Sequence, residues 1–228
     1  MATMLAYILT DLNVPKDTLD SCLKRVVKKS FNSIFVMSSQ MVPFSQSNDE
    51  IAEFESALLE VCMGLAEDIV RNGEGTQHVM KVTVNGAPDE LFARDLGRFV
   101  TNSNLFKCAI AGCDPNVGRI VGAIGSYLGN YVDHGEKYTK DLFITLGGMV
   151  IFKDGQFLLD PAKEKQLSDY LFDSQLFPSD MPEHDRNYPP HTKNVDITID
   201  LKSGPASCIV IGSDLTKEYV EVNADYRS

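Results

Sequence analysis

Paired cysteines are missing from this sequence. Its five cysteines are odd in number and scattered, and no two of them form a C-x-x-C pair: Cys22, Cys62, Cys108, Cys113 and Cys208. This spacing favours reduced thiols and argues against a disulfide framework or a structural zinc site. None shows the local histidine or cationic signature of a reactive thiol, so we interpret them as buried small side chains. The four histidines are equally dispersed, and no metal is predicted.

An excess of positive charge is also lacking. The formal net charge is -11 and the isoelectric point is about 4.8. Such a surface repels phosphate groups, so we expect no nucleic-acid partner. The apolar runs are too short to cross a bilayer, and residues 1–11 lack the basic start of a secretory signal and the Arg-rich pattern of a transit peptide. We therefore expect a soluble protein with no membrane partner.

A glycine-rich phosphate loop is the third absence. Gly122, Gly125 and Gly129 lie in or beyond a helical pattern rather than between a strand and a helix. We interpret these three glycines as helix-packing residues.

The apolar pattern predicts a mixed fold. With 228 residues and 43% hydrophobic content, the chain can bury a core, and we expect a single domain portion over residues 1–228. Strands and helices occur without regular β-α-β alternation, which favours an α+β layered fold over a doubly wound one. The predicted strands cover residues 4–10, 30–36, 78–84, 105–111, 142–152, 156–159, 195–201 and 207–211, and the predicted helices 15–27, 50–70, 89–100, 115–127 and 215–224.

The connections follow from turn signals. Asp154-Gly155 predicts a tight hairpin between the segments 142–152 and 156–159. Residues 38–50 are polar and turn-rich, and residues 177–190 are rich in proline and charge. Both are predicted to be irregular.

A set of segments in this chain resembles, in order, the second half of a known enzyme family. The segments are ATMLAYILTD (residues 2–11), SFN (30–32), EFESALLEVCMGLAEDIVRNGEG (53–75), NSNLFKCAIAGCDPNVGRIVGAIG (102–125) and SDLTKEYVEVNADYRS (213–228). Together they are similar to the ornithine acetyltransferase (glutamate N-acetyltransferase) family of arginine biosynthesis. The conjunction is specific, whereas any one segment alone is weak.

The resemblance implies an αββα-type sandwich of the N-terminal-nucleophile-like class and a precursor that cuts itself between Ala2 and Thr3. Thr3 is then the catalytic nucleophile. Cleavage frees its α-amino group, whose pKa of about 8 suits a base near neutral pH. Thr3 would take the acetyl group from N-acetylornithine and pass it to glutamate. Without the resemblance, Thr3 would be interpreted as an ordinary strand residue.

The resemblance also implies four substrate-binding residues: Thr3, Glu74, Asn223 and Ser228. Glu74 would contact the substrate's amino group, since a desolvated amine needs a partner of opposite charge. Its alternative interpretation is an exposed turn residue between two glycines. Asn223 and Ser228 would close over the site from the end of the chain.

The implied partner is the N-terminal alpha chain of the same precursor, in a heterotetramer of two alpha and two beta chains. That half carries the family's oxyanion hole, so this chain alone is expected to be inactive. No cofactor is expected, although acetyl-CoA is an alternative acetyl donor. The expected location is the cytoplasm, or the mitochondrial matrix in a eukaryote.

Two departures keep other functions open. Residues 37–49 differ from the family, and Val117 stands in place of a tryptophan, a change that leaves a cavity unless neighbours repack. One alternative is a catalytically impaired homologue kept for binding. Another is an aminopeptidase of the same fold class, which uses an N-terminal serine.

Overall fold

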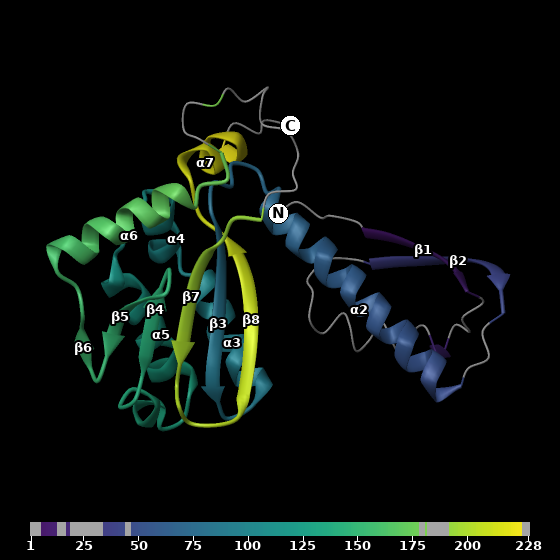
Figure 1. Cartoon of the computed structure of the whole chain (residues 1–228), viewed down its shortest axis with the longest axis horizontal. Coiled ribbons are helices and arrows are strands. Elements are labelled where there is room, and N and C mark those ends of the chain that lie inside the picture. The colour runs from purple at the N-terminus through teal and green to yellow at the C-terminus, as the bar shows by residue number, and fades with distance from the viewer. Residues whose placement is uncertain are drawn as a thin grey trace. The chain divides into compact units, whose positions relative to one another are not determined.

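The computed structural model describes residues 6–12, 17–18, 34–43, 47–177, 181 and 192–224. The chain divides into two compact units, Met1–Ile69 and Val70–Ser228, and each is described by itself (Figure 1). The single domain portion expected from the sequence stays a prediction. Within the described ranges, no helix combines the length and the apolarity needed to cross a membrane.

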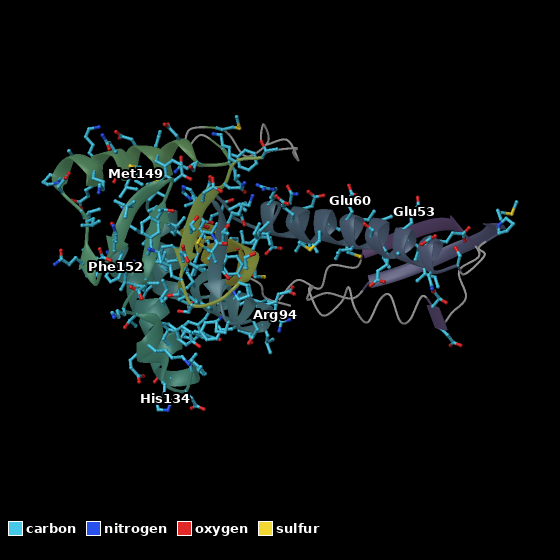
Figure 2. All side chains as sticks on the ribbon, turned by 60° about the horizontal axis from the view of Figure 1, so that its bottom comes forward. Glu53, Glu60, Arg94, His134, Met149 and Phe152 are labelled. Carbon is cyan, nitrogen blue, oxygen red and sulfur yellow. The ribbon has the colours of Figure 1, made fainter. Side chains whose placement is uncertain are left out.

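The first unit contains a pair of parallel strands and a long helix. Strand β1 (Ala6–Leu12) pairs with β2 (Ile34–Val42), and α2 (Asn48–Arg71) begins after Ser47. The predicted helix over 50–70 is confirmed. Phe54, Leu58 and Cys62 are its buried apolar residues and lie four positions apart, as one helical face requires. On its exposed side, Glu53 and Glu60 point away from the helix (Figure 2).

The prediction that residue 38 begins an irregular segment is wrong. Strand β2 continues to Val42, although Ser38, Ser39 and Gln40 are polar. Thr10 pairs with Ser38 and Leu12 with Val42, with a register irregularity between the two pairs. Backbone pairing with β1 therefore extends the strand beyond its apolar part. Residues 17–18 are helical, and the rest of the helix predicted over 15–27 lies outside the described residues.

The second unit is built on a six-stranded mixed sheet with the order β6-β5-β4-β7-β3-β8. The pair β3–β7 is parallel, and the other pairs are antiparallel. The strands are β3 (Val79–Ala87), β4 (Phe143–Leu146), β5 (Met149–Lys153), β6 (Gln156–Phe157), β7 (Val195–Asp200) and β8 (Ala206–Ser213). The predicted hairpin at Asp154-Gly155 is confirmed, with both residues at positive φ.

Helices flank this sheet, and α3 and α5 lie behind it in the view of Figure 1. The arrangement confirms the predicted α+β class. The helices of the second unit are α3 (Glu90–Thr101), α4 (Asn104–Ala111), α5 (Val117–Tyr131), the 3-10 helix η1 (Gly135–Tyr138), α6 (Pro161–Asp173) and α7 (Lys217–Ala224).

One predicted strand is a helix, and one further helix was not predicted. The segment 105–111 is helix α4 and not a strand, because its buried residues Phe106, Ala109 and Ile110 recur three and four positions apart. Helix α6 was not predicted, although its start carries an N-cap, since Asp160 Oδ1 accepts a 2.8 Å hydrogen bond from Lys163 N.

The predicted strand over 142–152 is two strands. Gly147 and Gly148 separate β4 from β5 at φ values of 57° and 76°, which favour glycine. This turn was hidden in the sequence by the apolar residues on both of its sides.

Helix α3 packs closely against strand β8 at Gly97. A Cβ atom added to Gly97 would lie 2.7 Å from Cγ2 of Val210. By contrast, Cβ atoms on Gly122, Gly125 and Gly129 would meet nothing within 4 Å. The interpretation of those three as helix-packing residues is therefore wrong, since the close approach that needs glycine is on α3.

A buried contact between a histidine and an aspartate joins the start and the end of the second unit. His78 Nδ1 lies 2.8 Å from Asp214 Oδ2, and both side chains are fully buried. Asp214 Oδ1 also accepts a 3.1 Å hydrogen bond from Gln77 N, and His78 Nε2 lies 3.0 Å from the Leu171 carbonyl oxygen. These contacts connect the start of β3 with the end of β8 and with α6.

Substituting Gly97→Ala should destabilise the protein by about 1–3 kcal/mol, because overpacking against Val210 outweighs the better helix propensity of alanine. The matched control Gly122→Ala should stabilise by roughly 0.5–1 kcal/mol, because it adds propensity without a clash. Urea unfolding of both variants measures the difference. Equal effects of the two substitutions would contradict the close α3–β8 contact.

Substituting Asp214→Ala should cost about 1–3 kcal/mol, because it leaves the buried His78 ring without its hydrogen-bond partner. Asp95→Ala is the control, since Asp95 pairs with Arg94 at a partly exposed position. It should cost at most about 1 kcal/mol. Thermal and urea unfolding measure both, and a small loss in Asp214→Ala would show that the buried pair contributes little.

Candidate functional site

A glycine turn between α2 and β3 presents Glu74. Arg71, at the end of α2, fixes the start of the turn by donating to the Lys193 carbonyl at 2.8 Å and to Asn194 Oδ1 at 2.7 Å. The turn closes with a 3.1 Å hydrogen bond from Thr76 N to the Gly73 carbonyl. Glu74 lies at its exposed tip. The side chain is therefore held on an ordered turn and open to solvent.

Gly75 lets this turn lie directly against helix α7. Its φ is +64°, in the region that favours glycine. A Cβ atom there would lie 2.5 Å from Tyr219 N and 3.0 Å from Thr216 Oγ1. No larger residue fits at this position without displacing the helix.

Helix α7 brings Asn223 to Glu74. Asn223 Nδ2 donates a 3.2 Å hydrogen bond to Glu74 Oε2 and a 2.9 Å hydrogen bond to the Tyr219 carbonyl. The residues are 149 positions apart in the sequence. The structure thus brings together two of the four substrate-binding residues predicted from the sequence. Their carboxylate and amide form a polar, exposed pair that can receive an amine.

The remaining predicted residues are not placed. Ala2, Thr3 and Ser228 lie outside the described residues. Their roles as cleavage site, nucleophile and substrate-binding residue stay predictions.

Two groups near Asp214 and His78 have shifted pKa values. Burial lowers the pKa of the Lys107 amine, and the nearby Asp214 charge opposes that shift. Burial raises the pKa of the Cys113 thiol, and the Gln175 amide donor, 3.5 Å away, partly lowers it. Although Cys113 Sγ lies 3.7 Å from His78 Nε2, a raised thiol pKa is typical of an unreactive cysteine.

Sequence reasoning missed three residues that hold the site together: His78, Asp214 and Thr216. Asp214 and Thr216 belong to the SDLT segment that carried the family resemblance, but their residue types give no sign of their partners. The chemistry of the pair itself calls for no metal. Among the residues that the structure describes, no three His, Cys, Asp or Glu side chains gather in a group that could bind one.

Comparison with known sequences identifies relatives of this chain. The sequence model of the ArgJ family matches residues 1–228. The arginine biosynthesis bifunctional protein ArgJ of Oceanobacillus iheyensis is 34% identical over 243 residues, covering 100% of this chain and 53% of that protein. A glutamate N-acetyltransferase of Methanopyrus kandleri is also 34% identical, covering 100% of this chain and 56% of that protein. The chain therefore spans about half the length of the curated relatives it matches.

A solved structure agrees with the sequence matches. The crystal structure of the arginine biosynthesis bifunctional protein ArgJ from Bacillus halodurans is similar with a TM-score of 0.78 and 28% identity. The similarity covers 98% of this chain and 100% of that chain. Because the family model matches residues 1–228 and the fold is similar to that of a solved ArgJ chain, this chain belongs to the ArgJ family.

Proposed function

We propose that this chain is the nucleophile-bearing half of an ornithine acetyltransferase, which transfers an acetyl group from N-acetylornithine to glutamate in arginine biosynthesis. The observation that carries the proposal is the 3.2 Å hydrogen bond between Asn223 and Glu74. It joins two positions at which the family resemblance expects substrate. Relatives named glutamate N-acetyltransferase and arginine biosynthesis bifunctional protein support the same reaction class.

In the proposed reaction, Thr3 is the nucleophile. Cleavage of the Ala2–Thr3 peptide bond frees the Thr3 α-amino group, which takes the proton of the Thr3 hydroxyl. The hydroxyl oxygen attacks the acetyl carbonyl, the carbonyl C–N bond breaks, and the Thr3 α-ammonium group gives its proton to the departing ornithine amine. The glutamate amine then attacks the acetyl-threonine ester, which releases N-acetylglutamate and restores the Thr3 hydroxyl. The whole acetyl group is transferred at each step, and no oxidation or reduction occurs.

Glu74 is the proposed amine anchor. Its carboxylate is exposed, so a cationic amino group can approach it and form a charge-assisted hydrogen bond. Asn223 holds one carboxylate oxygen of Glu74, while the Tyr219 carbonyl orients the Asn223 amide. This chain of contacts fixes the direction in which the carboxylate faces its substrate.

The proposed partner is the N-terminal alpha chain. Relatives are about twice as long as this chain, whereas the solved chain is matched over its whole length, which supports a family protein made of two polypeptides. Helix α7 buries none of its residues and exposes Tyr219, Val220 and Val222, as a surface awaiting a partner would. A heterotetramer of two alpha and two beta chains is the proposed assembly, with no cofactor and with acetyl-CoA as an alternative donor.

Co-expressed with the N-terminal half, the wild-type chain should transfer acetyl from N-acetylornithine to glutamate, and Thr3→Ala should lose this activity. Loss of the Thr3 hydroxyl removes the only oxygen that the mechanism acetylates. Intact-mass measurement after incubation with N-acetylornithine should detect an acetyl adduct on the wild type and none on the variant. Full activity in Thr3→Ala, or no adduct on the wild type, would favour a catalytically impaired homologue or another nucleophile.

Substituting Glu74→Gln should raise the KM for N-acetylornithine roughly tenfold or more, because a charged hydrogen bond worth about 1.5–3 kcal/mol is lost. The shape of the side chain is kept. Glu136→Gln is the matched control, since Glu136 is also exposed and lies in η1, a separate element. Steady-state kinetics should show an unchanged KM for the control. An equal KM in both variants would remove Glu74 from the site.

A further inference from the structure

We propose that Thr216 is a positioning residue of the acetyl-transfer site. Its hydroxyl joins the Gly75 turn to helix α7 and thereby sets Glu74 opposite Asn223. This inference rests on the proposed function for its kinetic consequence, although the geometry it invokes is independent of the reaction. Thr216 itself does not act on the substrate.

The Thr216 hydroxyl uses both of its hydrogen-bonding roles. Oγ1 donates to the Gly75 carbonyl at 2.7 Å and accepts from Tyr219 N at 3.1 Å. The second contact spans three positions at the start of α7, which is the geometry of a helix N-cap. One oxygen atom therefore caps the helix and ties it to a turn 141 positions away.

Each end of this bridge is directly connected to a proposed substrate-binding residue, one by a peptide bond and the other by a hydrogen bond. Gly75 directly follows Glu74 in the turn. Tyr219 carries the carbonyl that accepts a 2.9 Å hydrogen bond from the Asn223 amide. A displacement at either end of the bridge therefore moves Glu74 or Asn223 and changes the 3.2 Å contact between them.

None of the residues of helix α7 is fully buried. Polar contacts therefore contribute to the position of the helix on the turn, among them the Thr216 bridge and the Asn223–Glu74 contact. Thr216 lies two residues after Asp214, whose side chain is held in place by His78 and by Gln77 N. The Thr216 hydroxyl transmits that fixed position to the helix.

The test compares substitutions at one position with a matched threonine elsewhere. Thr216→Val keeps the branched shape and removes both hydrogen bonds, whereas Thr216→Ser keeps the hydroxyl. Thr139→Val is the control, because Thr139 Oγ1 also donates to a carbonyl, that of Glu136, at 2.7 Å and at an exposed position after η1. Gly75→Ala disturbs the same contact from the other side.

In the chain assembled with its N-terminal half, Thr216→Val and Gly75→Ala should raise the KM for N-acetylornithine about tenfold, as expected for a net loss near 1.4 kcal/mol. The kcat should change much less. Thr216→Ser should restore the KM to within about twofold of the wild type. Thr139→Val should leave both constants unchanged.

Amide hydrogen exchange on the full chain gives a readout that does not need the reaction. Residues 73–76 and 217–224 should exchange faster together in Thr216→Val and at the wild-type rate in Thr216→Ser and Thr139→Val. Unchanged exchange in Thr216→Val, or an unchanged KM in an active assembly, would overturn the positioning role. An inactive wild-type assembly would overturn the proposed function alone, and the exchange rates would still decide the role of Thr216.

Discussion

His78 and Asp214 are both fully buried, and each side chain needs the other as its hydrogen-bond partner. His78 directly precedes β3, and Asp214 directly follows β8. Their pair fixes the start of β3 against the end of β8. The Glu74 turn leads directly into the first of these strands, and α7 leaves directly from the second. A buried, hydrogen-bonded pair is thus the fixed point from which Glu74 and Asn223, the two predicted substrate-binding residues, are presented at the surface.

Three successive contacts lead from the buried His78–Asp214 pair to the surface. The buried pair sets the strand ends, the Thr216 hydroxyl sets the helix against the turn, and Asn223 sets the Glu74 carboxylate. The outer contacts are partly buried or exposed, and each is weak by itself. Each contact has a defined geometry because its residues are held by a contact closer to the core. An exposed site can therefore still have a fixed orientation.

Sequence reasoning recovered the elements whose patterns are long and unambiguous. Helix α2 and strands β3, β7 and β8 follow from their apolar spacing. The segment of α4 is too short for its period to be decided from the sequence alone, and Gly147-Gly148 was hidden between two apolar strands. The need for glycine at position 97 could not be predicted, because it arises from the Val210 side chain on β8, which lies too close for a larger residue.

The site was recovered in part, and only through resemblance. Glu74 and Asn223 were predicted as substrate residues, but nothing local to either residue shows that the two meet. Thr216 and Asp214 were not predicted, because their partners are 141 and 136 positions away. Such partnerships are properties of the folded chain. They require the sheet to bring the start of β3 beside the end of β8.

The central claim is that Glu74 and Asn223 act on the substrate as one unit. A double-mutant cycle of Glu74→Gln and Asn223→Ala, read out as the affinity of the assembled protein for N-acetylornithine, tests it most directly. We predict a coupling free energy of about 0.5–3 kcal/mol, as found for residues in contact. Effects that add to within about 0.5 kcal/mol would contradict the claim, because independent residues do not form a shared substrate site.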